Sequence, residues 1–223
     1  MAVVDKATYS VAPLRIKPLP RLTRLYAGLL AYGMSMALMI EAKLGNMPWD
    51  VFHQGLALRT GLSIGAMTVI VGAVVLLLWI PLRQRPGLGT VSNVVVIGLA
   101  VDGSLALLPT PQQVWQRAGF LVAGILLCAL ATGLYVGARL GPGPRDGLMT
   151  GLAARGYSIR LVRTGIEVGV VAIGFLLGGT LGIGTVVFAL TIGPLSHITM
   201  PLLVTRKIDS ARAVDPAVAS SRS

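Results

Sequence analysis

The stretch that decides the fold is Ala42-Lys43-Leu44-Gly45-Asn46-Met47-Pro48-Trp49-Asp50, because the chain repeats its pattern further on. The second copy is Ala138-Arg139-Leu140-Gly141-Pro142-Gly143-Pro144-Arg145-Asp146, a shift of 96 residues (138 − 42). After the loss of one residue the shift becomes 95, and Gly87-Leu88-Gly89-Thr90 falls on Gly182-Ile183-Gly184-Thr185. The sequence therefore predicts two related halves, each with an xLGxxPxD loop and a GxGT turn.

Long apolar stretches surround these motifs. The chain of 223 residues is 54% hydrophobic and only 12% charged, with a mean hydropathy of +0.79. A soluble domain carries about 25% charged residues, and a helix needs about 20 apolar residues to cross a bilayer. We therefore predict an all-α integral membrane protein with six transmembrane helices, at residues 22–40, 63–82, 90–108, 118–138, 159–177 and 185–204.

Two segments that follow the repeated loops, 50–60 and 146–156, are too short to cross a membrane. We expect short re-entrant or interfacial helices there. Each half then crosses three times, which is an odd number, so the second half enters from the opposite face. The sequence thus predicts two inverted three-span repeats, 21–110 and 111–204, related by a pseudo-two-fold axis in the membrane plane. The basic tails 1–20 and 205–223 are expected to be disordered.

The net charge of +11 follows the rule that basic residues stay on the cytoplasmic side. With the N-terminus inside, only Lys43, Arg59 and Arg117 of the 19 Lys and Arg residues fall outside. This distribution predicts that both termini are cytoplasmic. It also explains the basic character of the chain without nucleic acid as a partner, and leaves the lipid bilayer as the expected environment.

The two repeated loops carry a family resemblance. Ala42–Val51 with Gly55-Leu56, and Gly141–Met149, are similar to the signature of the bacterial YczE/YyaS/YitT group of multi-pass membrane proteins. The likeness covers about residues 20–205, although the spans between the loops are generic. It implies a bacterial inner (plasma) membrane protein. It implies little biochemistry, and no catalytic residue can be carried over from it.

Polar side chains within the membrane region are the candidate site residues. Asp50 and Asp146 stand at the start of the short segments, where a carboxylate either caps a helix or lines a pathway for a cation or polar solute. Glu167 lies inside the fifth span with Arg163 four residues before it, so the two form either a self-contained pair or a coupling site. Asp102 and His197 occupy equivalent positions in the third and sixth spans.

Signatures of known enzymes are absent from the sequence. It contains neither H-E-x-x-H nor G-x-S-x-G, and two histidines and one cysteine offer little for a metal site. We expect no enzymatic activity, no cofactor and no bound metal. One interpretation is a transporter of a small molecule or ion, which would make an unknown small solute its partner. The other is a non-transporting accessory protein that assists an envelope or biosynthetic system. The sequence does not determine the oligomeric state.

Overall fold

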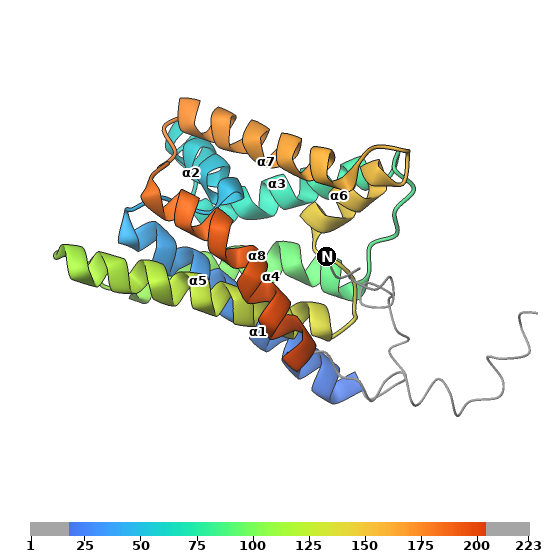
Figure 1. Cartoon of the computed structure of the whole chain (residues 1–223), viewed down its shortest axis with the longest axis horizontal. Coiled ribbons are helices and arrows are strands. Elements are labelled where there is room, and N and C mark those ends of the chain that lie inside the picture. The colour runs from blue at the N-terminus through green and yellow to red at the C-terminus, as the bar shows by residue number, and fades with distance from the viewer. Residues whose placement is uncertain (1–17, 204–223) are drawn as a thin grey trace, which may run out of the picture.

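The computed structural model describes residues 18–203, and all its regular elements in this range are α-helices (Figure 1). Except for residues 18–20, which begin the first helix, the tails 1–20 and 205–223 lie outside the described residues. The helices are α1 (Pro18–Ala42), α2 (Pro48–Thr60), α3 (Ile64–Trp79), α4 (Leu88–Leu107), α5 (Val114–Gly137), α6 (Pro144–Ala153), α7 (Ile159–Leu176) and α8 (Ile183–Leu203).

The six predicted spans all correspond to helices, namely α1, α3, α4, α5, α7 and α8. Five of these are long and apolar enough to cross a membrane. They are α1, α4, α5, α8 and the segment Ile64–Leu82, which contains α3. The exception is α7, which has 18 residues and carries Arg160, Arg163 and Glu167. An all-helical protein in which several helices are long and apolar enough to span a membrane is thus confirmed for the described residues.

The two short helices begin in the same way. Pro48 and Pro144 occupy the first turn of α2 and α6, where a missing N–H costs nothing. The helices have 13 and 10 residues, which corresponds to roughly 20 Å and 15 Å at about 1.5 Å per residue. Both are much shorter than the roughly 30 Å hydrocarbon core of a bilayer. Neither can span it.

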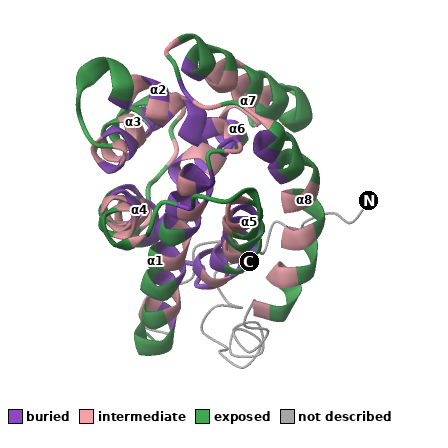
Figure 2. Cartoon of the chain, turned by 90° about the vertical axis from the view of Figure 1, so that its left-hand side faces the viewer, coloured by how far each residue is buried: buried purple, intermediate pink, exposed green. Residues whose placement is uncertain are grey.

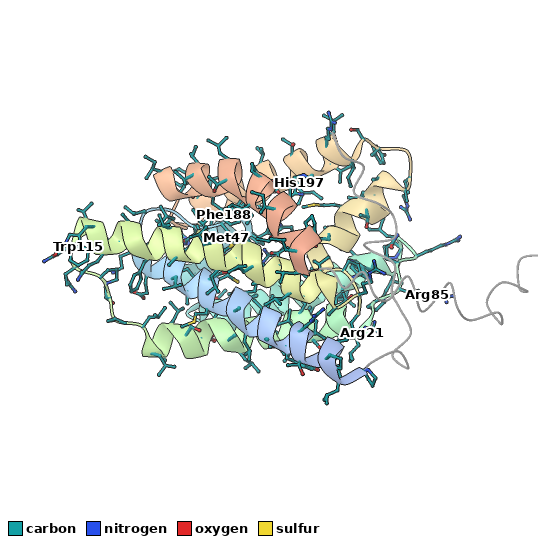
Figure 3. The ribbon with its side chains drawn as sticks, turned by 60° about the horizontal axis from the view of Figure 1, so that its bottom comes forward. Arg21, Met47, Arg85, Trp115, Phe188 and His197 are labelled. Atoms are coloured by element: carbon teal, nitrogen blue, oxygen red, sulfur yellow. The ribbon has the colours of Figure 1, made fainter. Side chains whose placement is uncertain are left out.

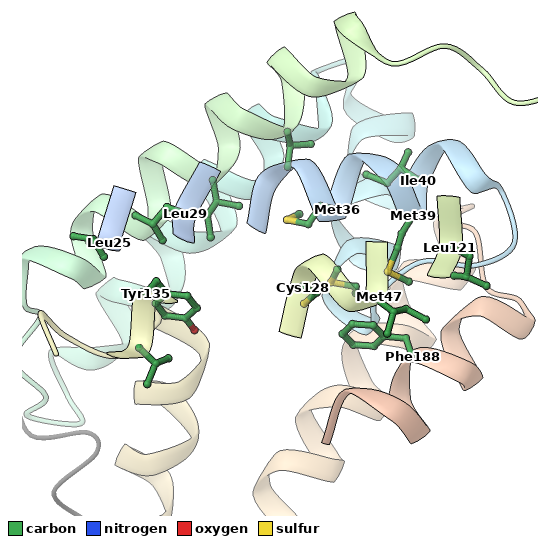
Figure 4. Close-up of a cluster of buried hydrophobic side chains, with 14 of the residues drawn as sticks. Leu25, Leu29, Met36, Met39, Ile40, Met47, Leu121, Cys128, Tyr135 and Phe188 are labelled. Carbon is green, nitrogen blue, oxygen red and sulfur yellow. The ribbon is translucent and has the colours of Figure 1, made fainter. Parts of the chain in front are cut away.

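The centre of the protein is an antiparallel pair formed by α1 and α5. Arg21, at the start of α1, donates hydrogen bonds of 3.0 and 3.1 Å to the carbonyls of Ala138 and Arg139 after the end of α5. At Gly28 the helices are so close that a Cβ atom would lie 2.8 Å from the backbone nitrogen of Tyr135. Figure 4 shows the side chains that pack around this pair, among them Leu25, Leu29, Met36, Met39, Leu121, Cys128 and Phe188.

Each repeated loop docks on the GxGT turn of the other half. The carbonyl of Leu140 accepts a 2.8 Å hydrogen bond from the backbone N–H of Gly89, and the carbonyl of Leu44 accepts one of 2.8 Å from Gly184. The glycines in these loops, Gly45 and Gly141, have φ angles of 121° and 130°. Their backbone conformation strains any other residue, so the glycines permit both the turn and the contact.

The backbone conformation repeats between the halves. Every residue with positive φ in the range 18–203 belongs to a pair separated by 96 or 95 positions: Lys43 and Arg139, Gly45 and Gly141, Gly61 and Gly156, and Arg83 and Gly178. Positive φ angles are uncommon outside glycine, so their occurrence at equivalent positions of both halves supports a structural repeat. The sequence repeat therefore extends to matching turns in the structure.

The short helices pack against long helices of the opposite half. α2 contacts α7, and α6 contacts α3. In one interface Trp79 lies over Gly147 and donates a 3.0 Å hydrogen bond to the Pro144 carbonyl. In the equivalent interface Gly174 lies against the backbone of Val51 and Phe52. Each contact therefore joins a glycine to a larger neighbour.

The second half is more open than the first. α3 and α4 pack closely, and a Cβ atom at Gly65 would lie 2.1 Å from the Gly98 carbonyl oxygen. The equivalent helices α7 and α8 make no extended contact with each other. Figure 2 shows buried residues gathered around the central helices, whereas α8 is largely intermediate or exposed. Residues of both α7 and α8 line a cavity between the two halves.

Candidate functional site

A cavity of about 450 Å³ lies between the two halves and is lined by residues from all eight helices. Pockets that hold small molecules have volumes of roughly 300–1,000 Å³. The lining combines polar and aromatic side chains: Tyr32, Trp49, His53, Asn93, Thr132, Tyr135, Arg145, Asp146, Arg163, Glu167, Phe188, Ser196 and His197. Its size and its polarity are those of a site for a small polar solute.

The structure brings four of the predicted site residues together. Asp146, Arg163, Glu167 and His197 all line the cavity, from α6, α7 and α8. Figure 3 shows His197 on α8, on the same side of the molecule as Phe188. The remaining predicted residues, Asp50 and Asp102, do not line the cavity, and each has a different environment.

Asp146 projects from the first turn of α6. Its Oδ2 atom accepts one hydrogen bond, from the Tyr135 hydroxyl at 3.4 Å. Burial raises the pKa of Asp146 above its ordinary value, and the guanidiniums of Arg163 and Arg145 oppose this effect. The residue that precedes α6 is Gly143, which has no side chain to cap the helix. The Asp146 side chain is partly buried and borders the cavity.

Asp50 is completely buried in the first turn of α2. Its Oδ1 atom lies 3.5 Å from His53 Nδ1 and 3.9 Å from a terminal nitrogen of Arg145. Neither carboxylate oxygen accepts a hydrogen bond from another group within the described part of the chain. Burial lowers the pKa of His53, and the nearby Asp50 opposes this effect. Asp50 itself does not line the cavity, but it contacts Arg145 and His53, which do.

Arg163 and Glu167 form the predicted pair on α7. The Nε atom of Arg163 lies 3.0 Å from Oε1 of Glu167, at the i,i+4 spacing expected from the sequence. Their side chains are 60% and 33% exposed, which places the pair at the open side of the cavity rather than in the packed interior. The pair therefore contributes partly exposed polar groups to the cavity lining.

Asp102 is held by hydrogen bonds at the start of α3 and does not line the cavity. It accepts hydrogen bonds from the Ser63 hydroxyl at 2.6 Å and from the Gly65 backbone N–H at 2.8 Å. These contacts tie α4 to the first turn of α3. At the equivalent place in the second half, His197 is exposed and lines the cavity. The two equivalent positions thus have different surroundings.

Arg145 and Trp49 are cavity residues to which the sequence analysis assigned no role. The Arg145 guanidinium lies 4.9 Å from the centre of the Trp49 ring, over its face. The two residues occupy equivalent positions of the repeated loops, 96 residues apart, and meet where the halves face each other. That equivalence is the signal that could have found them. Trp49 is 7% exposed, and its Nε1 atom has no hydrogen-bond partner.

Comparisons with known proteins place the chain in a family. Residues 19–201 match a family model described as "Family of unknown function (DUF6198)". An "Uncharacterized protein" of Haemophilus influenzae is 38% identical over 86% of this chain and 88% of its own length. The "Uncharacterized membrane protein YczE" of Bacillus subtilis is 33% identical over 81% and 86%, respectively.

A more distant relative, the "Uncharacterized protein YyaS" of Bacillus subtilis, is 26% identical over 79% of this chain and 90% of its own length. No solved structure matches the chain. The match to the family model and the relative named as a membrane protein agree with the apolar helices described above. The chain belongs to the DUF6198 family, and it is related to the uncharacterised membrane protein YczE and to YyaS.

Proposed function

We propose that this protein is a transporter of a small polar solute in the bacterial inner membrane. The observation that carries the proposal is the cavity of about 450 Å³, which brings Arg145, Asp146, Arg163 and Glu167 to one place. Ionisable side chains within membrane helices are costly and mark substrate or ion pathways. Nothing in the proposal requires a catalytic step, a cofactor or a metal.

The proposed topology has six spans in two inverted repeats, with both termini in the cytoplasm. It is supported by the antiparallel arrangement of α1 and α5 and by the crossed docking of the repeated loops. α7, the fifth span in chain order, would bring the number of spans to six, since its 18 residues extend about 27 Å at about 1.5 Å per residue. Its charged pair faces the cavity, which lowers the cost of placing these charges in the membrane.

A labelling experiment tests this topology. Figure 3 shows Trp115 at one end of the molecule and Arg21 and Arg85 at the other. We expect Gln112→Cys, at the Trp115 end, to react in intact cells with a thiol reagent that cannot cross the membrane. Pro86→Cys, at the opposite end, should react only after lysis. Both variants carry Cys128→Ser, and labelling of Pro86→Cys alone in intact cells would reverse the proposed orientation.

A vesicle uptake screen tests transport. Amino acids, amines, carboxylic acids and inorganic ions would be offered to liposomes that contain the purified full chain. Any solute taken up should be blocked by Ala189→Phe, because Ala189 lines the cavity. Leu190→Phe is the matched control, since Leu190 is the next residue of α8, does not line the cavity and is 71% exposed. Equal uptake by the two variants would contradict a pathway through the cavity.

The accessory role is the second candidate, and one observation favours it. The contact between α1 and α5 is tightly packed, with Leu25, Leu29 and Met36 completely buried beside it. A packed seam between repeats is typical of a rigid scaffold, and it would have to stay fixed while other parts move. If no solute of the screen enters the liposomes and a thiol reagent fails to reach Ser196→Cys in the cavity, the accessory role is supported and transport is rejected.

A further inference from the structure

The charges around the cavity can be matched in pairs, with one exception. Glu167 lies 3.0 Å from Arg163, and Asp50 lies 3.9 Å from Arg145. The fifth group, Asp146, has the Tyr135 hydroxyl as its hydrogen-bond donor within residues 18–203, at the long distance of 3.4 Å. Counting Asp50, which lies outside the cavity lining, two guanidiniums thus serve three carboxylates. A partly buried carboxylate without a full counter-charge favours the arrival of a positive group.

The cavity also has aromatic walls. Tyr32, Trp49, Tyr135 and Phe188 all line the cavity. The face of an aromatic ring attracts cations, and the position of Arg145 over Trp49 shows that these walls accommodate one. Aromatic surfaces around an acid are the usual surroundings of a bound ammonium ion, whereas a divalent metal ion needs several oxygen ligands.

We propose, on the basis of the transport function above, that the cavity binds a small organic cation, a primary or quaternary ammonium compound, with Asp146 as its counter-charge. The Nε1–H group of Trp49 adds a second requirement, since it is buried beside the cavity and no acceptor for it lies within residues 18–203. A hydroxyl or carbonyl group on the same ligand would satisfy it. The expected ligand thus combines one positive charge with a hydrogen-bond acceptor.

The test uses choline as the probe and the full chain in lipid nanodiscs. Isothermal titration should show that choline binds and that 3,3-dimethylbutan-1-ol, its neutral counterpart of the same shape, binds at least about tenfold more weakly. This comparison needs no substitution and is independent of any folding defect. The inference is overturned if the neutral compound binds as well as choline, or if choline and tetramethylammonium both fail to bind.

Two substitutions with opposite effects identify the counter-charge. Asp146→Asn keeps the shape and removes the charge, so choline affinity should fall roughly 30-fold. Arg145→Gln removes the guanidinium beside Asp50 and one of the two guanidiniums that act on Asp146, and it clears the Trp49 face, so choline should bind more tightly than to the wild type. Asp102→Asn is the control, since Asp102 lies outside the cavity and its loss should leave the affinity unchanged. Unaltered affinity in Asp146→Asn overturns the assignment.

These results can be separated from those of the transport test. If choline does not bind, while the uptake screen finds another solute whose entry Ala189→Phe blocks, the cation assignment is rejected and the transport function remains. If choline binds with the predicted dependence on Asp146 but no solute crosses the membrane, the binding site is supported and transport is rejected.

Discussion

The helix pairs α3–α4 and α7–α8 occupy equivalent positions in the two halves, yet only α3 and α4 pack closely against each other. Three glycines, Gly65, Gly72 and Gly98, lie at the α3–α4 contact. Their counterparts 95 positions later are Arg160, Glu167 and Gly193. The charged side chains of α7 occupy the places where glycines let α3 approach α4. At two equivalent positions, α3 has glycines and α7 has charged residues. The helix with glycines is packed against its neighbour, and the helix with charged residues borders a cavity.

The largest effect is expected at the equivalent glycines of α4 and α8. A Cβ atom at Gly98 would lie 2.5 Å from a methyl group of Val69 and 2.7 Å from the Gly65 carbonyl oxygen, while one at Gly193 would meet no atom within 4 Å. Gly98→Val should therefore destabilise the protein by about 3 kcal/mol. Gly193→Val should change stability by less than about 0.5 kcal/mol. Unfolding in detergent, followed by circular dichroism, measures both values. Equal losses would show that α7 and α8 pack as α3 and α4 do.

A smaller effect is expected at the polar pair Asp102 and His197. Asp102→Asn weakens two hydrogen bonds of a carboxylate to the start of α3, at 2.6 and 2.8 Å, and should cost about 1–2 kcal/mol. His197→Asn should cost less than about 0.5 kcal/mol, because His197 is exposed on the open side. The same unfolding measurement compares them. A larger loss for His197→Asn would mean that α8 holds α7 through this residue.

The smallest effect on stability is expected at Arg163 and Glu167. Because this pair is partly exposed, Glu167→Gln should cost less than about 1 kcal/mol, and so should Arg163→Met combined with Glu167→Leu. Solute uptake should nevertheless fall if the pair acts in transport. A double variant that keeps full uptake would remove both residues from the candidate site. A large loss of stability would instead show that the pair is structural.

Much of the fold could be predicted from the sequence because its determinants are local. Each apolar stretch has the length of a span, and each became a helix. Pro48 and Pro144 placed the starts of α2 and α6, and the spacing of Arg163 and Glu167 predicted their contact. The repeated loops also marked the positions of the matching turns. These features depend on neighbours within a few residues, so the order of amino acids determines them.

The candidate site could be predicted only in part. Asp146 was identified by its place at the start of a short helix and His197 by its equivalence to Asp102. Arg163 and Glu167 were identified by the cost of placing ionisable groups in a membrane, which is a property of each residue alone. Asp102 has the same property, but Ser63 and Gly65 bind it away from the cavity. Whether a polar residue lines a pathway or ties two helices together depends on a partner 37 to 39 residues away.

The sequence by itself determined the helices, their order and the duplication, since hydrophobicity, turn residues and repeated motifs act at short range. Only the tertiary structure decided which helix pairs pack closely and which do not. It brought Arg145 over Trp49 through a contact between opposite halves of the chain, and it left Asp146 with a long hydrogen bond to Tyr135. The physical reason is that such contacts are set by how closely two backbones approach. At α3 and α4 glycines permit that approach, whereas α7 carries Arg160 and Glu167 at the equivalent positions.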